Sequence, residues 1–330
     1  MDEERIFKVI QKIMEDVPLV LAGSGCSAPY GLPSMAVLGA HLMEKLSPKY
    51  SGNAQWDKFQ TELSRGADLE AALTDVLVSK EMLDDIRIEC WKCISKYDFE
   101  FFDKLMFDPI SFPLADLLKT MSRPHPSCVN IVTTNYDRVI EYACDHGNLA
   151  VNTGFAGQYC RWFSSNAFPT KNSINLIKVH GSLDTYIDSH GASFSVPLQR
   201  KLPAGIVPDM ITPGTQKYQA VLTGPVSRQL LHTADEFIMK ASSFLCIGYG
   251  FNDEQIQQNI FTQTKKGVPI IVLTKMVSEK TATLLDNSTK NYISIAEGPE
   301  EGTTELWVNR KKSILEGTYW TVEGFMKIIS

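Results

Sequence analysis

The sequence lacks the long apolar stretches and the leader pattern that direct a chain into or across a membrane. Its longest apolar runs, such as residues 268–273, are far shorter than the roughly 20 residues that a membrane-spanning helix needs. The first residues are charged and mostly acidic, whereas a signal peptide begins with a basic segment followed by an apolar one. We therefore expect a cytoplasmic protein with no membrane association.

The cysteines lack the regular spacing of a disulfide or zinc framework. The chain has 7 cysteines, of which Cys90 and Cys93 form the single C-x-x-C pair. A zinc ribbon needs a second such pair, so two neighbours on one helix face explain this pair better than a metal site does. We expect reduced thiols and no bound metal.

A surplus of positive charge is also missing. The net charge is −6, from 32 basic and 38 acidic residues, and a mildly acidic surface repels phosphate backbones. We therefore expect no direct binding to nucleic acid. The chain is 330 residues long and 44% hydrophobic, which is enough to bury a full core. That length suits two ordinary domains or one α/β domain with an inserted module equally well.

Short apolar or β-branched runs alternate with segments of helical periodicity, which is typical of a parallel sheet with crossover helices. The predicted strands are 17–22, 129–134, 174–179, 244–248 and 270–274, with weaker strand patterns at 292–295 and 306–308. The predicted helices are 3–14, 35–46, 69–77, 82–94, 101–118, 136–145, the second half of 216–241, 253–263 and 320–329. The predicted fold class is α/β, a Rossmann-like parallel sheet with helices on both faces.

These elements favour a single domain, residues 1–330, that carries two insertions. No strand pattern interrupts residues 51–120, so we expect an inserted helical module between the first two strands of the sheet. Residues 184–215 are rich in Pro, Gly and Ser over most of their length. This composition favours a hairpin and a loop over the edge of the sheet.

Glycines and polar residues follow four of the predicted strands, at the ends that face the ligand crevice of an open parallel sheet. The first motif is a glycine-rich turn whose backbone N–H groups suit a pyrophosphate. It is neither G-x-G-x-x-G nor a P-loop with its lysine, which disfavours a conventional dehydrogenase or a nucleotide triphosphatase. An ordinary strand–helix turn is the alternative. The residues of this motif are Gly23, Ser24, Gly25, Cys26, Ser27 and Pro33.

Two further motifs place groups with acid–base chemistry at strand ends. Asn135 and Asp137 follow the second strand, where capping of the next helix is the simpler explanation for either side chain. His180 and Gly181 follow the third strand. Histidine suits proton transfer near neutral pH, and a following glycine leaves space for a ligand.

The fourth motif follows the strand 244–248 and consists of Gly248, Tyr249 and Gly250, continued by Asn252 and Asp253. Glycines at a strand end permit close approach of a ligand's backbone or phosphates. With this motif added, the order and composition of all four resemble the sirtuin superfamily over residues 17–274.

The resemblance extends to individual positions. The family's glycine, small residue, glycine, any residue, serine and later glycine-x-proline are met, with Ser24 in place of the usual alanine. The family's asparagine and aspartate match Asn135 and Asp137, and its catalytic histidine–glycine pair matches His180 and Gly181. The segment 248–253 corresponds to the family's ribose and phosphate loop.

The chain departs from deacylating sirtuins, which carry four zinc cysteines after the catalytic histidine. Here that part of the sequence contains only Cys246. The segments 133–137 and 248–253 look like the zinc-less bacterial branch of antiphage defence systems, whose members hydrolyse NAD. The resemblance therefore implies an NAD hydrolase, with NAD as the substrate and no zinc, that yields nicotinamide and ADP-ribose.

The roles of the residues also come from the resemblance. Asn135 is expected to orient the water and the ribose, and His180 to act as base toward a ribose hydroxyl or the water. Asp137 is expected to position the nicotinamide–ribose end of NAD. The turn 23–27, Pro33 and the loop 248–250 are expected to bind pyrophosphate and ribose through backbone groups.

Two alternatives stay open. The same pocket could transfer ADP-ribose or remove acyl groups from a protein, or the chain could be a non-catalytic nucleotide-binding subunit of a defence complex. Since a free NAD hydrolase drains the cell's cofactor, we expect restraint by homo-oligomer assembly or by a separate partner protein. The resemblance favours a HerA-type ATPase as that partner, with an Argonaute-type protein as the alternative. The sequence does not separate NAD from NADP as the substrate.

Overall fold

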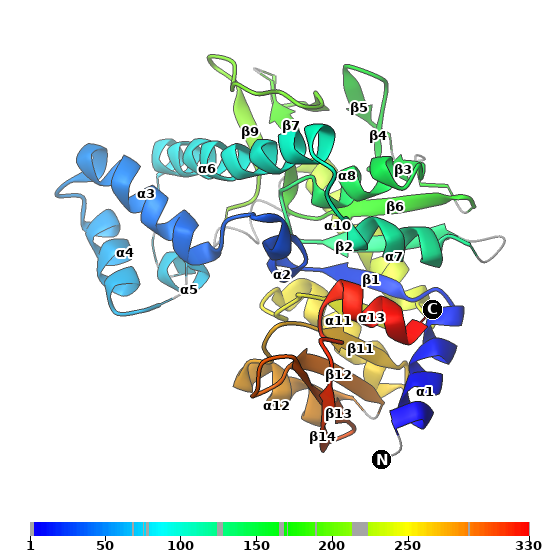
Figure 1. Cartoon of the computed structure of the whole chain (residues 1–330). Helices are drawn as coiled ribbons and strands as arrows, with labels where there is room; N and C mark the ends of the chain where they lie inside the picture. Colours follow the sequence, from blue (N-terminus) through cyan, green and yellow to red (C-terminus); the bar gives the residue numbers. More distant parts are fainter. Residues whose placement is uncertain are drawn as a thin grey trace.

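A nine-stranded, largely parallel sheet forms the centre of the protein (Figure 1). The computed structural model describes residues 3–67, 69–74, 76, 79–123, 128–164, 168–169, 171–188, 190–212, 224–289 and 291–329. The strand order is β14-β13-β12-β11-β10-β1-β2-β6-β3, and only the pairs β12–β13 and β13–β14 are antiparallel. The strands are β1 (Leu19–Ala22), β2 (Cys128–Thr133), β3 (Val151–Asn152), β6 (Ser173–Lys178), β10 (Phe244–Ile247), β11 (Ile270–Leu273), β12 (Tyr292–Glu297), β13 (Thr303–Val308) and β14 (Lys311–Glu316).

The position of β1 determines where a ligand crevice forms. The strand pairs in parallel with β2 on one side and with β10 on the other, so the chain leaves β1 in both lateral directions. In register, Ala22 lies beside both Thr133 and Ile247, and Thr133 lies beside Lys178. The carboxyl ends of these four strands therefore meet at one edge, at the topological switch point of the sheet.

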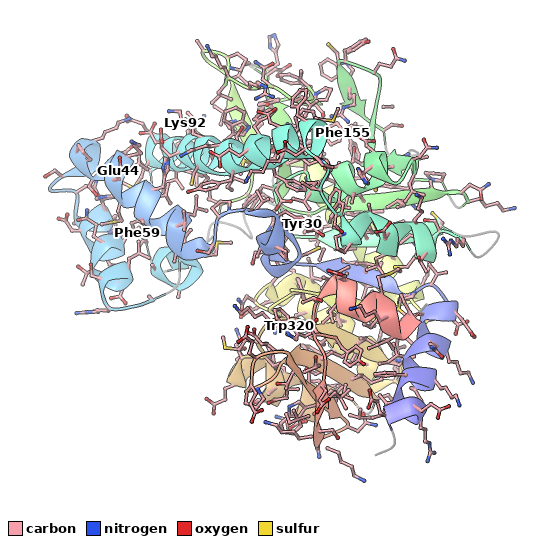
Figure 2. All side chains as sticks on the ribbon, viewed as in Figure 1. Tyr30, Glu44, Phe59, Lys92, Phe155 and Trp320 are labelled. Atoms are coloured by element: carbon pink, nitrogen blue, oxygen red, sulfur yellow. The ribbon has the colours of Figure 1, made fainter. Side chains whose placement is uncertain are left out.

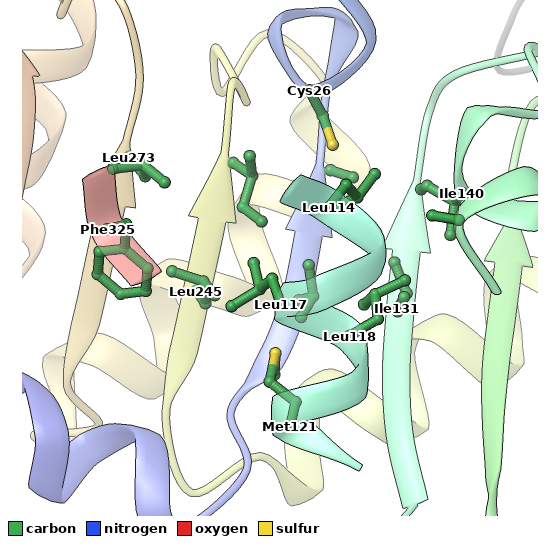
Figure 3. Close-up of a cluster of buried hydrophobic side chains, with 14 of the residues drawn as sticks. Cys26, Leu114, Leu117, Leu118, Met121, Ile131, Ile140, Leu245, Leu273 and Phe325 are labelled. Carbon is green, nitrogen blue, oxygen red and sulfur yellow. The ribbon is translucent and has the colours of Figure 1, made fainter. Parts of the chain in front are cut away.

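Helices cover both faces of the sheet, which confirms the predicted α/β class. Along β1 the side chains alternate, with Val20 and Ala22 in one hydrophobic core and Leu19 and Leu21 in the other, as the two-residue period of a strand requires. Figure 3 shows the first core, where α7 lies across the strands. The first face packs against α1 (Glu3–Glu15), α7 (Pro113–Met121), α8 (Val139–His146) and α13 (Val322–Ile329), and the second against α10 (Pro225–Lys240), α11 (Glu254–Lys265) and α12 (Glu279–Ser288).

A separate group of helices lies to one side of the sheet, at the left of Figure 1. It consists of α3 (Met35–Tyr50), α4 (Ala54–Ser64), α5 (Leu69–Thr74) and α6 (Lys80–Phe107). Its own core includes Trp56 and Phe59, and Figure 2 marks Phe59 within the group. The expected module 51–120 differs from this packing, because α3 joins the group whereas α7 packs on the sheet.

A second, five-stranded antiparallel sheet stands beyond α6, in the order β4-β5-β8-β7-β9. Its strands are β4 (Phe155–Ala156), β5 (Arg161–Phe163), β7 (Gly181–Ile187), β8 (Ser193–Ser195) and β9 (Val207–Met210). The hairpin and loop expected over 184–215 are thus three strands of this sheet up to Met210, and residues 213–215 lie outside the described part. Polar strand residues and short lengths explain why the sequence pattern did not indicate it.

Two of the differences between predicted and observed helices have a local reason. The predicted helix 101–118 is interrupted between α6 and α7, where Pro109 disfavours helical backbone in the residue before it and Pro113 starts the next helix. The helix predicted from residue 136 begins only at Val139. Among the described residues, no helix is both long and apolar enough to cross a membrane.

Candidate active site

A cavity of about 200 Å³ opens at the switch point of the sheet. All four sequence motifs contribute to its wall, and so do the start of α3 and the helical group. The predicted residues in the wall are Gly23, Ser24, Ser27, Pro33, Asn135, Asp137, His180, Tyr249 and Gly250. Gly25, Cys26 and Gly248 lie behind the wall rather than in it.

Asn135 joins the loop after β2 to the loop after β1. Its side-chain Nδ2 donates to the Gly23 carbonyl (2.9 Å) and to Ser27 Oγ (3.1 Å). Ser27 Oγ in turn donates to Asp137 Oδ1 (2.9 Å). The three side chains are less than one-tenth exposed, so each bond is shielded from competing water. The first two motifs therefore form one rigid network.

Asp137 combines two functions that the sequence left as alternatives. Its Oδ1 accepts from the Val139 backbone N–H at the start of α8 (3.2 Å), which is the capping role, while the residue also lines the cavity. Burial raises the pKa of this carboxyl, and the nearby Lys178 ammonium opposes that rise. The cavity thus holds a carboxyl group whose charged form the protein interior disfavours.

Lys178 stabilises the loop between β2 and α8. Its Nζ donates to the backbone carbonyls of Tyr136 (3.2 Å) and Asp137, and it pairs with Glu141 Oε1 (2.8 Å). These bonds satisfy carbonyls that a helix starting at residue 136 would have used itself. They explain why α8 begins three residues late and why residues 134–138 remain available for the site.

Arg138 connects the same loop to the helical group and the second sheet. Its guanidinium bonds Asp98 of α6 through Nε (2.9 Å) and Asp184 of β7 through Nη1 (2.9 Å). Arg161 of β5 bonds the other oxygen of Asp184 (2.9 Å). Arg138 and Asp98 are almost wholly buried, and a buried charge is tolerated only with such partners.

His180 pairs with the carboxylate of Asp253, a residue of the fourth motif for which no role was predicted. Its Nε2 lies 2.8 Å from Asp253 Oδ2, and both side chains are nearly buried. Asp253 is also the N-cap of α11, where its Oδ1 accepts from the Ile256 N–H (3.2 Å). N-capping alone explains an aspartate directly before a helix. Nothing in the sequence therefore indicated that Asp253 also pairs with His180.

The glycines of the first and fourth motifs are required by the close contact between their two loops. A Cβ added to Gly23 would lie 2.4 Å from the Gly248 carbonyl oxygen, and one added to Gly25 would lie 2.7 Å from Gly248 Cα. The Gly25 N–H also donates to that carbonyl (3.1 Å). These residues are glycines because the two loops pack backbone against backbone. A Cβ added to Gly250 would by contrast make only an ordinary contact, 3.5 Å from Asn252 Nδ2, and Gly250 lines the cavity.

Gly181 is likewise required by the backbone around it. Its φ is +86°, and an added Cβ would lie 1.9 Å from the Asp209 carbonyl oxygen of β9. The glycine is needed where the chain turns from the central sheet into β7.

Cys26 points away from the cavity. The side chain is 2% exposed, and Figure 3 shows its sulfur directed toward Leu114 in the first hydrophobic core. Burial, with a smaller contribution from Asp137, raises the pKa of this thiol to about 12. Cys26 therefore contributes its backbone to the glycine turn, while its side chain belongs to the hydrophobic core.

The cavity also contains residues that the motifs did not include. Leu69 of α5 and Ile94 of α6 contribute apolar surface from the helical group, and Ile211 contributes from the end of β9. In the sequence, nothing distinguishes these three residues from other apolar core residues. Their role in the wall follows only from the packing of the helical group against the strand ends.

Two structural observations bear on metal binding. Cys90 and Cys93 are both buried on α6 within the helical group. Across the part of the chain that the structure describes, no three His, Cys, Asp or Glu side chains are grouped so that they could hold a metal ion.

Comparison with known proteins identifies the family. The profile of the SIR2-like domain matches residues 129–294, from β2 to β12. Similar solved structures include one on the mechanism and regulation of Sir2 enzymes (13% identity, TM-score 0.47, 99% of this chain and 97% of that chain). A mutant Sir2 homologue in complex with ADP-ribose has 16% identity and a TM-score of 0.48, with 90% of this chain and 91% of that chain covered.

A Sir2–peptide–NAD⁺ complex has 13% identity and a TM-score of 0.43, with 88% of this chain and 92% of that chain covered. No curated protein sequence matches the chain. The matched region includes Asn135, His180 and the loop after β10, which are the strand ends that surround the cavity. The chain therefore belongs to the SIR2-like domain family, within the sirtuin superfamily.

Proposed function

We propose that the protein is an NAD⁺ glycohydrolase that cleaves the nicotinamide–ribose bond and releases nicotinamide and ADP-ribose. Proteins with sirtuin-type domains use NAD. The main support from the structure is that Asn135, Asp137 and His180 line a single cavity beside the two packed glycine loops. That cavity lies at the switch point of a parallel sheet, where such folds bind nucleotides.

The reaction requires little covalent assistance from the protein. As the C1′–N bond of the nicotinamide riboside breaks, its electron pair passes to nicotinamide and the ribose acquires oxocarbenium character. A water oxygen then bonds to C1′ and loses a proton. The enzyme has to hold the ribose, admit one water and accept that proton. Asn135 orients the ribose and the water, and His180 accepts the proton.

Asp137 positions the nicotinamide–ribose end in this proposal. Burial makes ionisation of its carboxyl unfavourable, and a cationic ribose in the cavity favours the ionised form. The glycine turn and the loop after β10 provide backbone groups for the pyrophosphate and the second ribose. Ser24, Pro33, Tyr249 and Gly250 line this part of the cavity.

Hydrolysis is favoured over protein deacylation because the zinc cysteines of deacylating sirtuins have no counterpart after His180 in the sequence. The sequence resemblance to defence proteins further suggests NAD depletion in antiphage defence as the biological role. In that role the chain assembles into homo-oligomers and acts with a separate partner, for which a HerA-type ATPase is the first candidate and an Argonaute-type protein the second.

The first prediction concerns NAD consumption by purified protein, alone and with either candidate partner. The wild type is expected to release equal amounts of nicotinamide and ADP-ribose, measured by chromatography. Asn135→Ala and His180→Ala are each expected to lower the rate by about 100-fold or more, since each removes a positioned catalytic group. Asn53→Ala and His232→Ala, which change the same residue types outside the cavity wall, are expected to retain the wild-type rate.

Other outcomes separate the alternatives. ADP-ribose attached to a protein, or acyl groups lost from an acylated peptide, would replace hydrolysis by transfer or deacylation. Tight binding of NAD without turnover in the presence of both partner types would instead indicate a nucleotide-binding subunit.

A further inference from the structure

We propose that Asp253 is a positioning residue for hydrolysis, because its carboxylate holds the His180 ring by Nε2 and directs the opposite ring nitrogen toward the reacting water. This inference rests on the proposed function and deepens it. The sequence resemblance assigned Asp253 no role of its own, and its N-capping bond accounts for only one of its two oxygens.

The geometry of the pair fixes the imidazole. Asp253 Oδ2 lies 2.8 Å from His180 Nε2, and the two side chains are 5% and 9% exposed. Asp253 directly precedes the first residue of α11. The Oδ1 of Asp253 accepts a hydrogen bond from the Ile256 N–H. The carboxylate is therefore anchored by the helix and cannot rotate freely. An anchored carboxylate 2.8 Å from one ring nitrogen favours a proton on that nitrogen.

Three charged residues near His180 have partners of their own among the described residues. Lys178, two residues earlier, turns to Glu141 and to the carbonyls of residues 136 and 137. Asp137 bonds Ser27, and Asp209 on the neighbouring β9 accepts from Ser193 Oγ (2.5 Å). The Tyr136 ring, 6.5 Å away between centroids, covers one side of the imidazole. Among the residues that the structure describes, Asp253 makes an ion pair with the ring.

The proton balance of hydrolysis gives the pair a function. In the neutral ring, the tautomer that carries its proton on Nε2, the nitrogen beside Asp253, leaves the lone pair on Nδ1. As water attacks C1′, its proton moves to Nδ1, and the resulting imidazolium lies against the Asp253 carboxylate. Nicotinamide leaves with the electron pair of the broken bond. The carboxylate thus stabilises the charge that develops on His180 during the reaction.

The test replaces the carboxylate while keeping the cap. In Asp253→Asn the amide oxygen still caps α11, because Asn is as good an N-cap as Asp, but Nδ2 or a neutral oxygen meets the ring. We expect the pKa of His180 to fall, because the variant removes an adjacent opposite charge. NMR titration of labelled histidine in the NAD-free protein measures this shift, with the resonance assigned by its loss in His180→Gln.

Steady-state kinetics provide the second measurement. We expect kcat to fall by about 10- to 100-fold and its acid limb to move to lower pH with the His180 pKa, while KM for NAD changes less than about twofold. A merely structural role would leave the pH profile in place. Thermal unfolding is expected to stay near that of the wild type because the cap is retained.

Glu89→Gln is the matched control, since it neutralises a carboxylate paired with another histidine. Glu89 Oε2 lies 3.1 Å from His41 Nε2 on the helical group. This variant should leave both the His180 titration and the kinetics unchanged.

The two proposals fail in different ways. Absence of NAD hydrolysis by the wild type would reject the proposed function, whereas the NMR titration would still decide whether Asp253 controls His180. An active enzyme whose Asp253→Asn variant has an unchanged His180 pKa and an unchanged pH profile would overturn the inference about Asp253.

Discussion

At the scale of single residues, several positions in and around the cavity are determined by backbone geometry rather than by ligand chemistry. Gly181 is the clearest case, because two independent constraints act on it. Its φ of +86° is unfavourable for any side chain, and the Asp209 carbonyl occupies the place of a Cβ. Gly191 has a similar φ of +81°, but no heavy atom of the described residues lies within 4 Å of the corresponding position.

These two glycines allow strain and steric conflict to be measured separately. Gly191→Ala is expected to cost about 1 kcal/mol in the free energy of unfolding, from the backbone alone. Gly181→Ala is expected to cost about 2 kcal/mol more, because the β9 backbone must also shift. Urea denaturation of both variants measures the difference. Equal costs would contradict the close approach of β9 to Gly181.

Asp137 gives a prediction about pH. Since burial raises its pKa above the unfolded value, the folded protein retains a proton that the unfolded chain has already released. Stability from this group therefore falls as pH rises from the unfolded pKa, about 3.9, to the raised folded pKa, and stays low above it. Asp137→Asn keeps an oxygen for Ser27 and removes the charge. Its stability relative to wild type is expected to increase with pH across that window.

Unfolding measured between pH 4 and pH 8 tests this prediction, and Asp103→Asn is the control. The Arg200 side chain lowers the pKa of the Asp103 carboxyl, which reverses the sign of its contribution. Stability from Asp103 is present above its unfolded pKa and lost below its folded one. Because that window lies below the unfolded pKa of about 3.9, the control variant is expected to keep a nearly constant difference from wild type between pH 4 and pH 8. A difference between Asp137→Asn and wild type that does not change with pH would contradict the buried charge.

At the scale of elements, the sequence predicted best where one periodicity runs without interruption. The apolar runs of β1, β10 and β11 and the amphipathic α1 lie within about two residues of their predicted bounds. The second sheet was not recognised, because β4, β5 and β8 are two or three residues long. Such strands are stabilised by partners distant in sequence, and their local pattern contains too little information.

The helical group illustrates how tertiary contacts decide an element's place. Phe59 is fully buried in its core, whereas Phe107 at the end of α6 is 82% exposed. Phe59→Ala is expected to lower the free energy of unfolding by about 3–5 kcal/mol through the cavity it leaves. Phe107→Ala is expected to change it by less than about 0.5 kcal/mol. Comparable values in chemical denaturation would mean that the helical group lacks a core of its own.

At the scale of the whole molecule, the sequence predicted most of the cavity residues that follow the strands of the sheet. It predicted none of those that the helical group contributes. Asn135 and His180 follow strands, and strand order alone brings parallel strand ends together at one edge. Leu69 and Ile94 reach the cavity only through the docking of the helical group. Asp253 reaches His180 only because α11 starts at the switch point. These placements depend on how elements pack, which one-dimensional patterns do not specify.

The contact between the loops after β1 and β10 has an evolutionary consequence. Gly23, Gly25 and Gly248 touch through main-chain atoms with no side chain between them. A mutation that adds a methyl group at one position finds no larger residue at the others to shrink in compensation. Second-site suppressors of such a mutation are therefore confined to changes that move a strand. We therefore expect sequence changes to accumulate instead in the part of the cavity wall that the helical group forms. There, a larger side chain at one position can be offset by a smaller one at another.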